Sequence, residues 1–438
     1  MVKTKIVVLD DDPTGIQTVH DINVLMNFEL ENLIAMMQDP DELVYLSTNS
    51  RSLLPAETEV LHRTLIQNLT EASKRTSRDF LVISRGDSTL RGHYPLESEV
   101  IKSELLNGGK VLRGEVLCPY LEGIRKTEED IHYVLQYDQW VPCAQTEFAK
   151  DKTFGYLHSN LCEYVNEKYK KKMSCLSIGT SLLDGHHNED VLELLNNAPM
   201  DAKIILNASC IEHLMTFVDI IEPFKEQYQY RTAASFVKAF AHVESRPLLE
   251  MESLCDCSNS GGLILAGSHV KKTTEQIECL LESGRIECLQ FDVTNEDDTQ
   301  IDTLSQQIDE RIRNGKNVLL MTSRDQVDFS EDTFEQLLAV RKVSERFVSV
   351  LKQIKVRPRF LISKGGITSY DVLKKGLNMT SGRVLGQVYQ NIPVVSLNED
   401  ALYGNLCVVV FPGNVGSTET LRDLVYNATK DCSAVFCC

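Results

Sequence analysis

Short runs of consecutive apolar residues recur along the chain, and a polar segment rich in Gly, Ser or Thr follows each run. In the first part of the chain these runs are Ile6–Leu9, Leu43–Leu46 and Phe80–Ile83. Continuous apolar runs bounded by turn residues are typical of strands buried on both faces, as in a parallel sheet. The intervals have the length of helices, and a helix is expected from Glu57 to Ser73. The pattern therefore predicts βαβ units.

The same pattern continues and then restarts after a break. Strands are expected at 115–117 and 203–207, and a helix that follows Arg231 closes the first region near residue 245. The polar stretch Ser253–Gly262 is the clearest boundary in the chain. The strands expected beyond it are Leu263–Ala266, Val318–Met321, Phe360–Ile362 and Leu406–Phe411.

We therefore predict an α/β protein with two domains, each with a mainly parallel sheet flanked by helices. The predicted boundaries are 1–245 for the first domain, 246–262 for a linker and 263–438 for the second domain. Ligands of open α/β sheets bind at the carboxyl ends of the strands, so the active site is expected at these ends, in the cleft between the domains.

The polar segments of the first half carry the candidate chemistry. Ser84–His93 contains two arginines, an aspartate, three hydroxyls and two glycines in ten residues, and Asp10–Gly15 contains three consecutive aspartates. Three adjacent carboxylates repel one another unless they face solvent, a cation or a hydroxyl that needs a base. Arg51, Arg85 and Arg91 could hold a ligand carboxylate through paired donors. The structural alternative is a set of surface turns in which Asp and Ser cap helices.

Glycines at strand ends are the main signal of the second half. Gly267 directly follows an expected strand, Gly413 follows one after a single intervening residue, and Gly365 follows one after two. Glycine lets backbone N–H groups approach a phosphate, and a following helix N-terminus adds its positive dipole end. Plain turn chemistry explains such glycines equally well. Neither the P-loop pattern nor G-x-G-x-x-G occurs, which disfavours a P-loop NTPase or an ordinary Rossmann dehydrogenase.

Composition and net charge limit the classes of partner that the chain is expected to bind. The net charge is −18 and no sustained run of Lys and Arg occurs, which argues against a nucleic-acid or anionic-membrane partner. The chain starts without a signal-peptide pattern and has no apolar run near the ~20 residues of a membrane helix, so a cytoplasmic location is expected. The 13 cysteines include no C-x-x-C pair. They are expected to be reduced thiols, with no protein-held metal.

The ordered set of these segments resembles the four-carbon acid sugar kinase family, whose members phosphorylate tetronates such as erythronate, threonate or 3-oxo-tetronates with ATP. The resemblance covers nearly the whole chain. Its landmarks are Asp10–Gly15, Asn49–Arg51, Asp87–Gly92, Thr146–Ala149, Gly267–His269, Lys364–Ser369 and Pro412–Gly416. The sequence departs from the family at Arg85, where many relatives have lysine, and in Pro119–Thr127, which lacks the phenylalanine-proline motif of the family. Both segments border the expected acid-binding pocket.

The resemblance implies a sugar-acid site in the first domain and a nucleotide site, with Mg²⁺, in the second. Together with the strand-end pattern it gives three sets of candidates. The catalytic candidates are Asp12 and Asp87. The substrate-binding candidates are Asp11, Arg51, Arg85, Ser88, Arg91 and Arg125. The ATP-binding candidates are Ser268, His269, Lys364, Gly365, Gly366, Ile367, Thr368, Gly413, Asn414 and Gly416.

The general base is expected to be either Asp12 or Asp87. Asp87 lies between two arginines, which would lower its pKa and weaken it as a base, so the sequence favours Asp12. The predicted reaction is ATP-dependent phosphorylation of the terminal hydroxyl of a four-carbon sugar acid. The alternatives are a kinase of another small hydroxy acid, such as glycerate, and a cytosolic sugar-acid sensor without activity. The sequence leaves open whether the chain forms a homo-oligomer.

Overall fold

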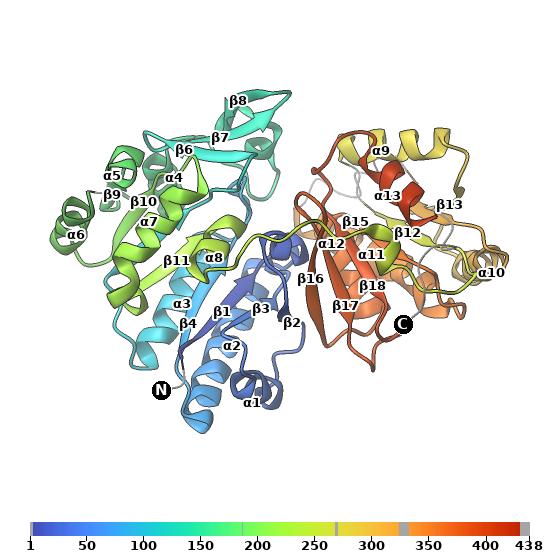
Figure 1. Cartoon of the computed structure of the whole chain (residues 1–438), viewed down its shortest axis with the longest axis horizontal. Helices are drawn as coiled ribbons and strands as arrows, with labels where there is room; N and C mark the ends of the chain where they lie inside the picture. Colours follow the sequence, from blue (N-terminus) through green and yellow to red (C-terminus); the bar gives the residue numbers. More distant parts are fainter. Residues whose placement is uncertain (1–2, 186, 268–269, 324–332, 430–438) are drawn as a thin grey trace. The chain divides into compact units, whose positions relative to one another are not determined.

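The computed structural model describes residues 3–185, 187–267, 270–323 and 333–429. The chain forms two compact units (Figure 1). The first contains the residues up to Thr18 together with Asn27–Glu244. The second contains Val19–Met26 together with the residues from Ser245 onward. The segment Val19–Met26, which lies within the predicted first domain, thus packs with the second unit.

The main sheet of the first unit is parallel. Its strands are β1 (Lys5–Asp10), β3 (Leu43–Ser47), β4 (Phe80–Arg85), β5 (Gly114–Cys118), β9 (Cys175–Ile178), β10 (Ala202–Leu206) and β11 (Tyr228–Thr232). They pair in the order β3-β1-β4-β11-β5-β10-β9. Every residue of β1, β3 and β4 is buried, as expected for strands covered on both faces.

Helices flank this sheet in two groups. They are α1 (Leu30–Gln38), α2 (Pro55–Thr76), α3 (Leu96–Asn107), α4 (Leu161–Tyr169), α5 (Thr180–Asp184), α6 (Asn188–Asn197), α7 (Ile211–Ile221) and α8 (Ala234–Phe240). Helix α2 packs against α1 and α3, whereas α7 packs against α5, α6 and α8. Helix α2 begins with Pro55 at its first position, and the Glu57 carboxylate accepts a hydrogen bond from the Leu54 N–H at 2.8 Å.

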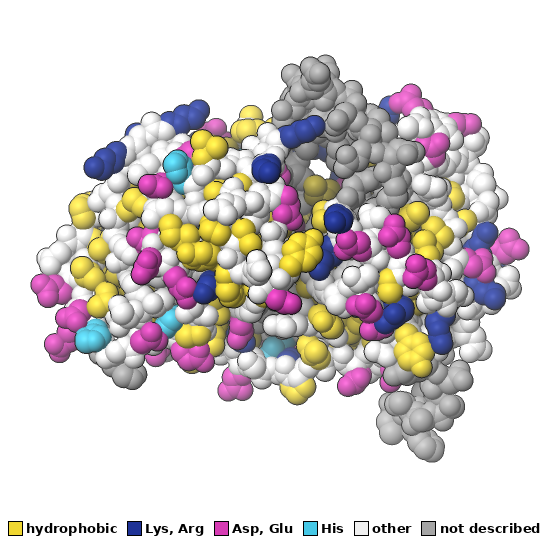
Figure 2. All heavy atoms as spheres, turned by 90° about the horizontal axis from the view of Figure 1, so that it is seen from above, with side chains coloured by type: hydrophobic (Ala, Val, Ile, Leu, Met, Phe, Trp, Pro, Cys, Tyr) yellow, Lys and Arg dark blue, Asp and Glu magenta, His cyan; other side chains and the backbone are white. Residues whose placement is uncertain are grey.

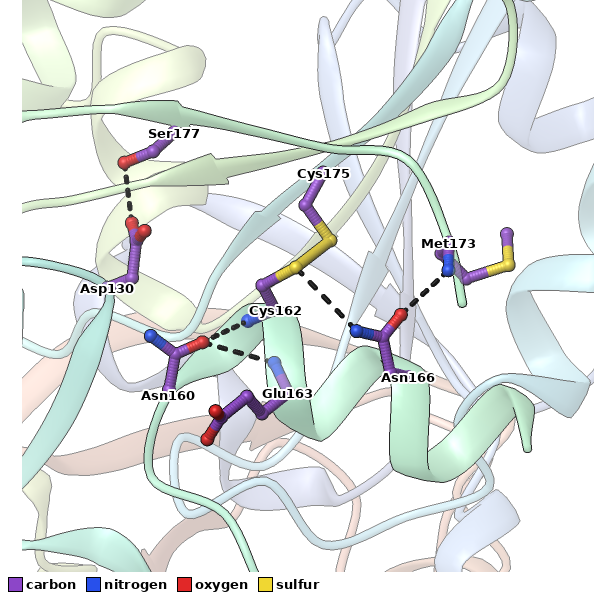
Figure 3. The surroundings of a disulfide bond; sticks show 8 residues. All are labelled: Asp130, Asn160, Cys162, Glu163, Asn166, Met173, Cys175 and Ser177. Carbon is purple, nitrogen blue, oxygen red and sulfur yellow. Dashed lines mark hydrogen bonds between the residues drawn. A yellow bond between two sulfur atoms is a disulfide. The ribbon is translucent and has the colours of Figure 1, made fainter. Parts of the chain in front are cut away.

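A small antiparallel sheet and a disulfide complete the first unit. The strands of the small sheet are β6 (Arg125–Glu128), β7 (Ile131–Gln136) and β8 (Gln139–Pro142). Cys162 of α4 is bonded to Cys175 of β9, with 6.0 Å between their Cα atoms (Figure 3). The expectation that all cysteines are reduced is therefore wrong. The 13-residue separation of this pair matches no motif, and only the fold brings α4 beside the start of β9.

The sheet of the second unit is mixed. Its strands are β2 (Ile22–Leu25), β12 (Leu263–Ala266), β13 (Glu287–Phe291), β14 (Val318–Thr322), β15 (Leu361–Lys364), β16 (Ser381–Tyr389), β17 (Ile392–Leu397) and β18 (Cys407–Phe411). The part β13-β14-β12-β15-β18 is parallel, and β17, β16 and β2 continue it in antiparallel pairs. The helices are α9 (Lys271–Glu282), α10 (Thr299–Arg313), α11 (Thr333–Gln353), α12 (Gly366–Asp371) and α13 (Thr420–Ala428).

The predicted class, an α/β protein with mainly parallel sheets flanked by helices, is confirmed. On the face shown in Figure 2, the described basic and acidic side chains are interspersed. Within the described ranges, no helix is both long enough and apolar enough to cross a membrane.

Candidate active site

Neighbouring strands of the first unit end side by side and carry the predicted polar segments. In the register of the sheet, Asp10 of β1 lies between Ser47 of β3 and Arg85 of β4, and Thr232 of β11 follows beside Arg85. The prediction that the three early polar segments share one edge of a parallel sheet is confirmed. The carboxyl edge of β3, β1, β4 and β11 therefore gathers the candidate side chains.

Arg51 is the centre of this edge. Its Nη2 donates to Asp11 Oδ1 at 2.7 Å and its Nε to Asp11 Oδ2 at 3.4 Å. Its Nη1 lies 3.4 Å from Asp12 Oδ2 and 3.9 Å from Asp87 Oδ2. Arg85 adds a second cation, with Nη1 at 3.4 Å from Asp11 Oδ1. The structure thus brings together both catalytic candidates and three of the substrate-binding candidates.

Asp12 is positioned by a local turn. Its Oδ1 accepts the Thr14 N–H at 2.8 Å, at the start of the short helix Pro13–Thr18. This side-chain turn is common for aspartate before a helix and fixes the position of the carboxylate. Asp12 is partly exposed, unlike the buried Asp11. Of the two carboxylates, Asp12 is the one that a ligand can reach more freely.

Asp87 is held by Arg91 and Thr89 of its own loop. Its Oδ2 accepts hydrogen bonds from Arg91 Nε at 2.7 Å and from the Thr89 hydroxyl. Burial raises the pKa of Asp87, but the charges of Arg91 and Arg51 outweigh this and hold the pKa well below its usual range. The carboxylate stays ionised and is a weak base. This geometry supports the preference for Asp12 over Asp87 as the general base.

Two tyrosine side chains hold the loop that carries Asp87. Tyr156 donates its hydroxyl hydrogen bond to the Thr89 carbonyl oxygen, and Tyr164 donates to the Leu90 carbonyl oxygen, both at 2.9 Å. Leu90 has a φ of 66°, an uncommon conformation for leucine. Both tyrosines are buried in one apolar cluster with Leu90. The tyrosines therefore fix a strained loop in one conformation.

Asp10 lies beneath the edge and is fully buried. Its Oδ1 lies 3.1 Å from Arg85 Nη1, whereas its Oδ2 has no hydrogen-bond partner among the described residues. Burial raises the pKa of Asp10 to about 7, and the charge of Arg85 opposes this rise only in part. Asp10 is a structural carboxyl group that changes charge near neutral pH.

Sequence reasoning missed a buried ion pair behind the site. Arg231, at the end of β11, donates from Nη1 to Glu97 Oε2 at 2.6 Å and to the Ser84 hydroxyl at 2.8 Å. Glu97 also accepts the hydroxyl hydrogen bond of Ser50. A Cβ added at Gly86 would lie 2.5 Å from the Arg231 guanidinium carbon. The pair therefore contacts the segments that carry Arg51 and Asp87, and a strand-end arginine was the signal that could have revealed it.

Two remaining substrate-binding candidates lie beside the small antiparallel sheet. Ser88 is buried, and its carbonyl oxygen lies 2.8 Å from Nε2 of His132. Arg125, the first residue of β6, is buried with its guanidinium 5.7 Å from the centre of the Phe148 ring. The Arg91 guanidinium lies 5.1 Å from the same ring. Phe148 therefore connects Arg125 to the loop of Asp87.

The candidate nucleotide site is formed by parallel strands of the second unit. In the register, Ala266 of β12 lies beside Lys364 of β15, and Lys364 lies beside Phe411 of β18. The residues that follow, among them Gly267 and Gly365, therefore lie along one edge. The structure brings together the described candidates of two sequence segments, 364–368 and 413–416, while Ser268 and His269 lie outside the described residues.

Lys364 is more constrained than the sequence suggested. It is fully buried, its Nζ donates to the Pro412 carbonyl oxygen at 2.8 Å, and Nζ lies 3.8 Å from the centre of the Phe411 ring. The ammonium group thus fixes the turn after β18. Gly365 donates its N–H to the Phe411 carbonyl oxygen at 2.8 Å and precedes α12.

The other candidates lie on the helix and turn that follow. Gly366, Ile367 and Thr368 form the first turn of α12, where N–H groups have no partner within the helix. Ile367 is exposed, whereas Thr368 is buried.

The turn after β18 is held by side chains of α9. Thr273 donates to the Gly413 carbonyl oxygen at 3.0 Å, and Lys272 Nζ to the Gly416 carbonyl oxygen at 3.2 Å. Asn414, between these two anchors, is exposed. The turn therefore presents Asn414 from a fixed backbone.

The acidic residues do not form a metal cage. Within the described part of the chain, no group of three or more His, Cys, Asp or Glu side chains has an arrangement that could hold a metal ion. Asp11 and Asp87 are bonded to arginines instead. We therefore assign no protein ligand to Mg²⁺ and derive no step through it.

Comparisons with known proteins assign a different kind of ligand to each of the two parts of the chain. A model of a sugar-binding N-terminal domain matches residues 6–240, and a model of a nucleotide-binding C-terminal domain matches residues 263–421. No curated protein matches the sequence.

Two solved structures resemble the whole chain. One is a Salmonella typhimurium LT2 protein provisionally named a tRNA synthase, with a TM-score of 0.68, 14% identity, and coverage of 98% of this chain and 99% of that chain. The other is a Haemophilus influenzae protein of the DUF1537 family, with a TM-score of 0.62, 14% identity, and coverage of 96% and 99%. At this identity the likeness shows the fold alone.

The fold and the family models define a protein with a sugar-binding domain followed by a nucleotide-binding domain. The chain belongs to the four-carbon acid sugar kinase family, the DUF1537 family, as its sequence motifs indicated.

Proposed function

We propose that this protein transfers the γ-phosphoryl group of ATP to the terminal hydroxyl of a four-carbon sugar acid, such as erythronate, threonate or a 3-oxo-tetronate. The observation that carries the proposal is the edge where Asp12 and Asp87 both face Arg51, at 3.4 and 3.9 Å. A partly exposed carboxylate beside fixed cations suits a site that binds a hydroxylated anion and removes a hydroxyl proton.

Asp12 is proposed as the general base. The substrate hydroxyl oxygen would attack the γ-phosphorus, its proton would pass to Asp12 Oδ2, and the bond between the γ-phosphorus and the bridging oxygen of ADP would break. Catalysis of phosphoryl transfer consists mainly of positioning and charge stabilisation. Arg51 and Arg91 are suited to positioning because aspartates hold their guanidinium groups in place.

ATP is proposed to bind at the edge of β12, β15 and β18. Support comes from the first turn of α12 at Gly366–Thr368, whose N–H groups can receive a phosphate. The Gly413–Gly416 turn, which Thr273 and Lys272 hold, offers a second backbone surface. Ser268 and His269 belong to the proposed site by their sequence position.

The test is ADP release from Mg-ATP with a panel of erythronates, threonates and 3-oxo-tetronates, each enantiomer measured separately, and with glycerate. Strong ADP release with one four-carbon acid is the expected result. Preference for glycerate would replace the substrate but keep the reaction. No acid-dependent ADP release, with sugar acid and ATP both bound, would contradict the kinase proposal and favour a sensor.

A further inference from the structure

Arg125 differs from the other arginines of the first unit's site in its partners. Arg51, Arg85, Arg91 and Arg231 each pair with an Asp or Glu oxygen at 3.1 Å or less. Within the described part of the chain, the Arg125 guanidinium bonds only to the neighbouring Ile124 carbonyl oxygen, at 2.6 Å. Its Nε is buried without any hydrogen-bond partner.

A buried arginine without a carboxylate is costly to the free protein. Only 5% of the Arg125 surface is exposed, so the charge has lost most of its hydration. A cation–π contact with the Phe148 ring, whose centre is 5.7 Å away, offsets part of the lost hydration free energy and holds the guanidinium group in place. A buried polar group without a partner needs a physical explanation, and a bound ligand is one such explanation.

The charges nearby indicate what that partner is. Asp10, Asp11, Asp12 and Asp87 lie around Arg51, Arg85 and Arg91, so these arginines are already largely neutralised by protein carboxylates. An anionic ligand group is repelled by this acidic cluster and attracted to Arg125, the one arginine of the five that forms no ion pair with a described carboxylate. A planar guanidinium with free donors binds a carboxylate through paired hydrogen bonds.

We propose that Arg125, held by Phe148, receives the carboxylate of the ligand, so that the hydroxyl end of the sugar acid faces the aspartates. This deepens the proposed function and rests on it for the identity of the sugar acid. Arg51, Arg85 and Arg91 then act on the hydroxyl end and on the aspartates. Arg125 is the residue that selects an acid over the corresponding neutral sugar alcohol.

The experiment compares Arg125→Met and Arg125→Lys with the wild type. The control is Arg113→Met. Arg113 directly precedes β5, at the amino end of that strand, and bonds to Leu195 and Asn196. Calorimetry without ATP measures the Kd of erythronate and threonate, with erythritol and threitol as neutral probes. We expect Arg125→Met to weaken acid binding about 10²-fold and Arg125→Lys about tenfold. Arg113→Met should leave acid binding unchanged.

The melting temperature supplies an independent test. Removal of an unpaired buried charge should maintain or raise the melting temperature of the free protein in Arg125→Met, because methionine fills similar space without a charge. An unfolded or destabilised Arg125→Met protein would overturn the proposal, as would unchanged acid affinity in both variants.

Failure of the proposed function gives a different result. If the wild type binds an acid through Arg125 but releases no ADP from Mg-ATP, the kinase proposal fails and the role of Arg125 stands. If ADP release keeps its normal acid KM in Arg125→Met, the role of Arg125 fails and the kinase proposal stands. Absence of acid binding to the wild type contradicts both.

Discussion

Arg51 and Asp11 form a two-point ion pair, with Nη2–Oδ1 at 2.7 Å and Nε–Oδ2 at 3.4 Å. The pair uses one edge of the guanidinium and leaves Nη1 facing Asp12 and Asp87. The Arg51 guanidinium is thereby fixed beside the two candidate bases. Asp11 therefore orients the Arg51 guanidinium toward the two candidate bases.

Replacement of the two candidate bases should separate their roles. Asp12→Asn is expected to lower kcat about 10²-fold or more with little change in nucleotide binding, because the proton acceptor is lost. Asp87→Asn should chiefly raise the KM for the sugar acid, because Arg51 and Arg91 lose a shared partner. Steady-state kinetics with ATP binding as the folding control would measure both. Near-normal kcat in both variants would refute the assignment of the base.

The buried pair of Glu97 and Arg231 should contribute strongly to stability. Glu97→Gln is expected to lower the free energy of unfolding by about 3–5 kcal/mol, because it leaves the Arg231 charge buried without its counter-ion. Burial opposes ionisation, but Arg231 lowers the pKa of Glu97 to about 2, so the charge is present at neutral pH. Urea unfolding would measure the loss.

Two further variants test that explanation. The double variant Glu97→Gln/Arg231→Met should recover part of the stability, since no unpaired charge remains. Glu59→Gln breaks an exposed ion pair to Arg63 on α2 and should have no measurable effect. Equal effects of Glu97→Gln and Glu59→Gln would show that the buried pair is not a stabilising centre.

Asp10 should make stability depend on pH. Its pKa is raised in the folded protein to about 7, so the folded state binds a proton more tightly than the unfolded state, in which the pKa is near 4. The stability from this proton is fully present below about pH 4 and is lost as the pH rises towards about 7.

The measurement is urea unfolding of the wild type and Asp10→Asn between pH 5 and pH 8. Asn cannot titrate, so the wild type should lose more stability than Asp10→Asn over this interval, by an amount of the order of a few kcal/mol. Parallel pH profiles for the two proteins would contradict the raised pKa.

The Cys162–Cys175 bond should be detectable and stabilising. It closes a short loop of 13 residues in sequence separation, for which about 3 kcal/mol is expected. Mass spectrometry of thiol-alkylated protein should find these two cysteines protected. Cys118 and Cys143 are buried free thiols and should react only after unfolding, which makes denatured protein the control. Alkylation of Cys162 in the unreduced, denatured protein would contradict the bond.

Gly416 should matter for ATP binding through its backbone conformation. It has a φ of 83°, and a Cβ there would lie 2.8 Å from the Thr420 hydroxyl oxygen. Gly416→Ala is expected to weaken ATP about tenfold, because the turn between β18 and α13 must shift. Gly284→Ala is a matched control, because Gly284 also has a positive φ of 65° but has open space around it. Equal ATP affinity in the two variants would remove Gly416 from the site.

Much of the fold follows from local sequence. Apolar runs such as Phe80–Ile83 predicted the buried parallel strands, because strands covered on both faces need apolar side chains at every position. Two of the missed strands, β13 and β16, lack that signal. In β16 buried and half-buried residues alternate, and β13 is largely exposed, so neither contains a continuous apolar run. Alternation in β16 was nevertheless a readable signal of a half-buried strand.

The candidate site was predictable in composition and not in pairing. Sequence position placed Arg51, Arg85 and Asp87 after neighbouring strands, and parallel topology brought them together. Pairing depends on side-chain directions across strands far apart in the sequence. The Glu97–Arg231 contact spans 134 positions, and no local pattern encodes it. For the same reason, only the three-dimensional structure shows that Arg125 has no carboxylate partner among the described residues.

The strand β2 has a consequence for dissection of the gene. Because Ile22–Leu25 pairs with β16 of the second unit, a cut at residue 245 does not separate two complete folding units. The amino-terminal fragment would carry β2 without its β16 partner, and the carboxyl-terminal fragment would expose the backbone of β16 as an edge that invites self-association. Complementary fragments expressed together should therefore be more soluble than either fragment expressed alone.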